Sequence, residues 1–142
     1  MKTSEMRLYL ENTLSQQLIF FYIGGLTLFT IFYINSMNVN VRLGIFIMVN
    51  IVLSLVGFLM AVRQKSYSSF WGYVGIALAL FQFARLLWMP EEIVGSVKFI
   101  SAALLIATGI SALVGSIICI KLSHERQKFI VEHNIDLSLL QR

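Results

Sequence analysis

The stretch "FISAALLIATGISALVGSIICI", residues 99–120, contains no charged side chain and decides the fold. An α-helix needs roughly 20 apolar residues to cross about 30 Å of hydrocarbon. The bilayer offers no water to pair the free backbone groups of an open strand, so a helix is expected. Similar apolar stretches occupy residues 18–34, 43–62 and 70–89. The sequence therefore predicts an all-α integral membrane protein with a bundle of four transmembrane helices.

The composition supports a membrane location. Hydrophobic residues make up 58% of the 142 residues and charged residues 13%, against about 45–50% and about 25% in soluble globular proteins. The formal net charge is +4, but the cations lie at the ends of apolar runs and form no basic stripe that would follow phosphates. We therefore expect the lipid bilayer as a partner and no nucleic acid.

The distribution of Lys and Arg predicts the orientation, because cations favour the cytoplasmic side of a membrane. One predicted side carries Lys2, Arg7, Arg63, Lys65, Lys121, Arg126, Lys128 and Arg142, whereas the other carries Arg42, Arg85 and Lys98. Both termini are thus expected in the cytoplasm. Residues 1–17 are predicted to be an amphipathic segment at the membrane surface, residues 18–121 the transmembrane domain, and residues 122–142 a helical cytoplasmic tail. No Asn-x-Ser/Thr site is present, which is compatible with a bacterial inner membrane.

Small residues recur every four positions along the fourth predicted helix. Close approach of helix backbones in lipid depends on such residues, and the series consists of Ala103, Ala107, Ser111, Gly115 and Cys119. A four-residue spacing drifts about 40° per step around a straight helix, so the series winds across the surface. It is predicted to pack against protein, either within the chain or between subunits.

Polar side chains inside the predicted helices are few. Asn50 and Gln82 are the amides well inside them, and each lies seven residues from the predicted outer end of its helix. At about 1.5 Å per residue they share a depth, which predicts a hydrogen bond between them. Arg85 lies one turn before Trp88 and is expected to extend its guanidinium outward. Glu91 and Glu92, which follow Pro90, are its predicted ion-pair partners; the alternative is a cation that contacts a ligand or a partner protein.

The sequence predicts no catalytic, cofactor-binding or metal-binding residue, and no cofactor is expected. General acid–base catalysis needs titratable groups within hydrogen-bond reach, and no Asp, Glu, Lys or His lies near the predicted midplane. Cys119 is the single cysteine, and His124 and His133 are nine residues apart, unlike the i, i+4 histidine pairs of helical metal sites.

The C-terminal tail carries apolar residues on more than one side and would be poorly solvated alone. It is predicted either to rest on the lipid headgroups or to dock on a partner. The predicted docking residues are Phe129, Ile130, Ile135, Leu139 and Leu140. We therefore expect a non-catalytic accessory or scaffolding subunit of a larger complex, with other integral membrane subunits as partners. The alternative is a small homo-oligomeric channel or transporter, for which Asn50, Ser54 and Gln82 would supply a polar stripe. A membrane enzyme of lipid or quinone chemistry is the third interpretation.

Overall fold

The computed structural model describes residues 13–63 and 69–134. They form four helices: α2 (Thr13–Ser36), α3 (Val41–Arg63), α4 (Phe70–Leu87) and α5 (Gly95–Glu132). No β-strand occurs in these two ranges. Each helix is long and apolar enough to cross a membrane, which confirms the predicted all-helical architecture and indicates an integral membrane protein.

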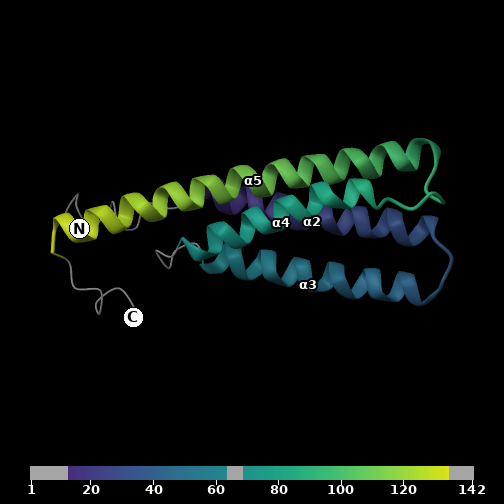
Figure 1. Cartoon of the computed structure of the whole chain (residues 1–142), viewed down its shortest axis with the longest axis horizontal. Helices are drawn as coiled ribbons and strands as arrows, with labels where there is room; N and C mark the ends of the chain where they lie inside the picture. Colours follow the sequence, from purple (N-terminus) through teal and green to yellow (C-terminus); the bar gives the residue numbers. More distant parts are fainter. Residues whose placement is uncertain (1–12, 64–68, 135–142) are drawn as a thin grey trace.

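The four helices run alternately in opposite directions along one long axis (Figure 1). α5 packs extensively against both α2 and α4, whereas α3 packs mainly on α2 and only lightly against α4. Of the four, α5 is the longest, and it extends beyond the others at the end of the bundle where α2 begins (Figure 1). α5 is therefore the central packing element, and α3 lies at the edge.

The first helix begins earlier than predicted. α2 begins at Thr13, so residues 13–17 of the predicted surface segment belong to it; residues 1–12 lie outside the described part. Hydropathy marks the edge of the membrane rather than the end of a helix, which explains this difference. α5 continues without interruption from the fourth transmembrane stretch through residue 132, into the predicted helical tail.

The buried face of α5 follows steps of three and four residues. Ser101, Leu105, Thr108, Ala112 and Cys119 lie on this face, together with Ser116, Ser123, Arg126 and Ile130. Such spacing keeps one seam of a helix turned toward its neighbours over many turns. The small side chains in the seam let α2 and α4 approach closely, as helix packing in lipid requires.

The predicted small-residue series packs within the chain over its C-terminal part. Ser111, Gly115 and Cys119 are buried, Ala107 is half-buried, and Ala103 is exposed. The hydroxyl of Ser111 donates to the carbonyl of Leu18, and that of Ser15 donates to the carbonyl of Gly115 at 2.6 Å. Because a four-residue spacing drifts around the helix, the series leaves the seam at Ala107 and Ala103.

α4 contributes two glycines to its contact with α5. A Cβ atom placed on Gly72 would meet the side chain of Ile120, and one placed on Gly75 would meet Ser116 and Met60. The absence of side chains at these positions therefore sets how closely the two backbones approach. In return, Gly109 of α5 leaves room for the ring of Phe83.

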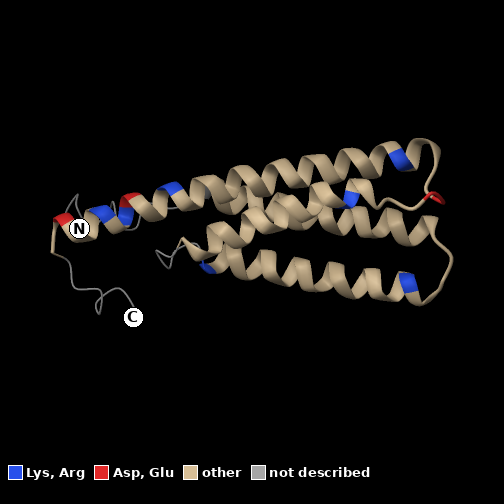
Figure 2. Cartoon of the chain, in the orientation of Figure 1, with Lys and Arg blue, Asp and Glu red and all other residues tan. Residues whose placement is uncertain are grey.

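Charged residues of the described helices gather toward the two ends of the bundle, and the middle carries none (Figure 2). The outer face of α3 consists of exposed apolar side chains along its whole length: Ile45, Met48, Ile51, Val52, Leu55, Phe58 and Val62. Lipid acyl chains would cover such a face in a membrane. The arrangement thus has an apolar belt between two charged ends.

Candidate functional site: a buried arginine in an aromatic pocket

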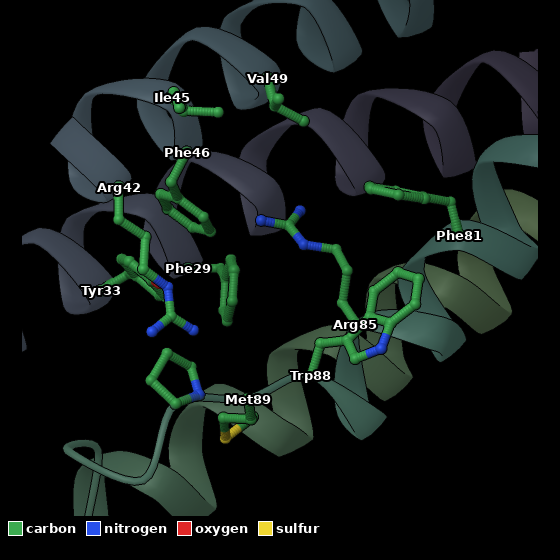
Figure 3. Close-up of a pocket in the computed structure, with 11 residues that line it drawn as sticks. Phe29, Tyr33, Arg42, Ile45, Phe46, Val49, Phe81, Arg85, Trp88 and Met89 are labelled. Carbon is green, nitrogen blue, oxygen red and sulfur yellow. The ribbon is translucent and has the colours of Figure 1, made fainter.

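The most distinctive polar group in the described structure is Arg85, in the last turn of α4. Its side chain is only 8% exposed. The guanidinium carbon lies 4.7 Å from the ring centre of Phe29, 5.0 Å from that of Phe46 and 5.7 Å from that of Phe81. The cation is therefore enclosed by aromatic rings of α2, α3 and α4 (Figure 3), which attract it through their quadrupoles.

A chain of hydrogen bonds connects Arg85 to α5. Its Nη1 donates to Oε1 of Gln82 at 3.1 Å, and Nε2 of Gln82 donates to Oγ1 of Thr108 at 2.9 Å. The Thr108 hydroxyl in turn donates to the carbonyl of Leu104 at 2.7 Å. Gln82 and Arg85 are three residues apart and so share a face of α4. The amide of Gln82 is fully buried, and its hydrogen bond orients the guanidinium of Arg85.

The predicted ion pair between Arg85 and Glu91 or Glu92 is wrong. Within residues 13–63 and 69–134, Arg85 forms no ion pair, and both glutamates are exposed. A turn after Pro90, closed by the Ile93 amide donating to the Pro90 carbonyl at 3.3 Å, buries Ile93. This turn leaves the two carboxylates outside while the guanidinium faces inward. The predicted outward extension of Arg85 is also wrong, because its guanidinium lies among aromatic rings and donates to Gln82.

Beside Arg85 lies a pocket of about 240 Å³. Its walls come from α2, α3 and α4 and from the segment just after α4 (Figure 3). The lining consists of Phe29, Tyr33, Arg42, Ile45, Phe46, Val49, Phe81, Arg85, Trp88, Met89 and Pro90. Tyr33 and Phe46 stack with ring centres 3.5 Å apart and form one wall. The lining therefore combines two arginines with aromatic and aliphatic groups and includes no acidic side chain.

The pocket exists because α3 packs only lightly against α4. Ile45 and Val49 on α3 and Trp88 after α4 are exposed and mark its mouth. The floor is formed by the buried rings of Phe29 and Tyr33. Arg42 lies in the first turn of α3 and Arg85 in the last turn of α4. The pocket therefore lies near one end of the apolar belt, where a helix meets the interface.

The two predicted buried amides, Asn50 and Gln82, are both buried but do not bond to each other. Nδ2 of Asn50 donates to the carbonyl of Phe46 in its own helix at 2.7 Å, while Gln82 bonds to Thr108. Their predicted pairing is wrong because Gln82 faces α5 and α3 lies on the other side of the bundle. Both side chains are buried inside one copy of the protein, so they are not placed to line a pore between copies.

The predicted docking residues are divided between buried and exposed surroundings. Ile130 is buried, and Phe129 is half-buried with its ring stacked 4.0 Å from that of His133. Val131, on the opposite side of α5, is 75% exposed. Ile135, Leu139 and Leu140 lie outside the described residues.

Several residues around Arg85 were not singled out from the sequence. Thr108 donates to a carbonyl of its own helix and also accepts the hydrogen bond from Gln82. Phe29, Phe46 and Arg42 were not linked to Arg85. All three lie within about two turns of the helix ends that meet the end of α4, and this is the signal that connects them, since antiparallel neighbours place such turns at a similar depth.

Chemically, the site can hold an anion: it combines a cation that is almost fully buried with an open apolar pocket. Across the described residues, no three His, Cys, Asp or Glu side chains are grouped as metal ligands would be. Comparison with known proteins adds no assignment, since no family model, curated protein or solved structure matches this chain.

Proposed function

We propose that the protein is a non-catalytic accessory subunit of a larger integral membrane complex, located in a bacterial inner membrane with both termini in the cytoplasm. The observation that carries the proposal is the projecting end of α5. At about 1.5 Å per residue, the 38 residues of α5 correspond to about 57 Å, well beyond the roughly 30 Å of hydrocarbon in a bilayer. The part of α5 that follows its apolar stretch, residues 121–132, thus forms a helical arm outside the membrane.

The arm has two different sides. Ser123, Arg126 and Ile130 are buried, whereas Val131 is exposed. Val131 is an apolar side chain on the open side of this projecting helix, and we take it as the centre of a contact in which a partner receives one face of the helix. The arm would dock on a cytoplasmic part of a neighbouring subunit, while lipid or another membrane subunit would cover the outer face of α3.

The first test is topological. Single cysteines at Asn38 and His133, both exposed, are introduced into a Cys119→Ser background. The excess of cations at the end carrying the arm predicts that this end is cytoplasmic. A membrane-impermeant maleimide should therefore label position 38 in intact cells, and position 133 only after lysis. Labelling of position 133 from outside would overturn the orientation.

The second test concerns the partner. Removing residues 129–142 should leave the four helices inserted but reduce the co-purified subunit about tenfold or more, since loss of a central apolar contact typically costs that much affinity. Val131→Asp should act in the same direction. Val39→Asp is the matched control, because Val39 is 95% exposed in the connection between α2 and α3, at the opposite end of the bundle.

Quantitative mass spectrometry of complexes purified in mild detergent provides the measurement. Equal recovery with the wild type and with Val131→Asp would contradict docking through the arm. A pure homo-oligomer that conducts ions or carries a solute when reconstituted alone would favour the channel or transporter instead.

A further inference from the structure

The buried cation of Arg85 lacks a counter-ion within the described part of the chain. A guanidinium has five N–H donors, yet among the described residues Arg85 donates one hydrogen bond, to Gln82, a neutral amide. Burying a charge without an opposite charge is strongly unfavourable in a membrane protein. The aromatic rings around it compensate in part, but its remaining donors, at the side of the pocket, have no partner within residues 13–63 and 69–134.

We propose that this pocket binds the oxyanion head of a membrane amphiphile, either the phosphate of a phospholipid or the carboxylate of a fatty acid. The head would lie against the guanidinium of Arg85, with Arg42 at the rim adding a second positive charge. Arginine suits this role because its planar donors match a carboxylate or phosphate with two parallel hydrogen bonds.

The walls of the pocket favour an amphiphile over a free ion. Apart from the two arginines, the lining is aromatic and aliphatic, and exposed Ile45, Val49 and Trp88 stand at its mouth. A small hydrated anion would gain little from such walls, whereas the first part of an acyl chain would bury apolar surface against them.

The size and depth of the pocket agree with this occupant. Its volume of about 240 Å³ is below the roughly 300–1,000 Å³ of pockets that enclose a drug-sized ligand. It can therefore enclose the oxyanion head and the adjoining carbons of the amphiphile, while the rest of the acyl chain extends into the bilayer along α3. Arg85 is two residues from the end of α4, at the level where the oxyanions of lipids lie.

The charges of the pocket lining favour an anionic ligand. The carboxylates of Glu91 and Glu92 are close in sequence but do not line the pocket. An anion entering from the interface would therefore meet two cations and no lining carboxylate. A zwitterionic lipid head would carry its own cation toward Arg42 and is expected to bind less well.

Tryptophan fluorescence provides the test, because Trp88 lines the pocket and the other tryptophan, Trp71, does not. The full chain carrying Trp71→Phe is purified in dodecyl maltoside and titrated separately with phosphatidylglycerol, oleate, phosphatidylcholine and inorganic phosphate. A saturable change in Trp88 emission is expected with phosphatidylglycerol or oleate, and whichever binds more tightly identifies the source of the oxyanion. Equal binding of phosphatidylcholine, or binding of inorganic phosphate as tight as that of the lipids, would overturn the proposal.

Variants locate the binding. Arg85→Met should weaken the affinity about tenfold or more, since hydrogen bonds to charged groups contribute about that much. Lys98→Gln is the matched control: Lys98 lies at the same end of the bundle and is exposed, but it does not line the pocket. Its removal should change the affinity by no more than about twofold.

Val49→Phe fills the mouth of the pocket and leaves both arginines in place, so it tests the site even if Arg85→Met fails to fold. It should weaken binding to a similar degree while the helical circular dichroism spectrum stays unchanged. Wild-type affinity in either folded variant would show that the lipid binds elsewhere and would overturn the assignment.

Discussion

Replacing Gly25 with leucine is expected to force α2 away from α5 and to lower the free energy of unfolding by about 1–3 kcal/mol or more, as overpacking of close-packed interiors does. Gly25 is buried where α2 approaches α5. A Cβ atom at this position would collide with the methyl group of Thr108. A leucine carries three more carbons, and the seam of small residues leaves no space into which they can turn.

The adjacent glycine provides the control. Gly24 is exposed, and a Cβ atom there would meet nothing within 4 Å. Gly24→Leu should therefore stay within about 0.5 kcal/mol of wild type, as surface substitutions usually do. Both variants are compared by titrating detergent-solubilised protein with sodium dodecyl sulfate and following tryptophan fluorescence. Equal stability of the two variants would show that α2 and α5 are not closely packed at Thr108.

Much of this architecture follows from hydropathy alone. Four apolar stretches separated by short polar connections specify four membrane-crossing helices, because the bilayer permits few other structures for such segments. Helix ends do not follow from hydropathy, since a helix can continue into water. α5 continues to Glu132, whereas its apolar stretch ends near residue 120.

The small-residue series shows where periodicity is informative and where it is not. Spacing by four identified Ser111 and Gly115, which do contact α2. The same spacing included Ala103, which is exposed, because a fixed four-residue step leaves any straight seam after a few turns. The actual seam alternates steps of three and four and contains Leu105 and Thr108.

The site could be predicted only in part, because its members come from different helices. Arg85 and Gln82 stand out in the sequence as polar groups in apolar surroundings. The carboxylates nearest to Arg85 in sequence, Glu91 and Glu92, are not its partners in space, since they lie beyond Pro90 in a turn that leaves them exposed. Phe29 and Phe46 contact Arg85 because α2, α3 and α4 lie at matching depths. These depths depend on the connections and the packing across the whole bundle.

Gln82→Leu is expected to destabilise the protein by about 2–4 kcal/mol, as removing one partner of a buried charged group does. The amide of Gln82 is fully buried and connects two helices: it accepts from Arg85 at 3.1 Å and donates to Thr108 at 2.9 Å. Leucine has a similar size but cannot accept a hydrogen bond. The substitution would therefore leave the buried guanidinium with aromatic rings as its partners among the described residues.

Two further variants identify the cause. In the double variant Gln82→Leu, Arg85→Met, the stranded charge is removed as well, and replacing a whole buried polar group by apolar residues is often neutral. The double variant should thus recover most of the lost stability, measured by the same sodium dodecyl sulfate titration. A double variant no more stable than Gln82→Leu alone would show that lost packing, and not the unpaired charge, causes the destabilisation.

Asn50→Leu provides the comparison with a second buried amide. Nδ2 of Asn50 bonds to a carbonyl of its own helix, and its Oδ1 has no partner within the described residues. Removing a buried acceptor that is already unpaired costs little, so Asn50→Leu should be close to neutral or slightly stabilising. A large loss of stability at Asn50 would mean that this amide bonds to a group outside residues 13–63 and 69–134. The contrast between the two amides therefore tests whether burial alone, or the charge that Gln82 supports, determines the cost of losing an amide in this bundle.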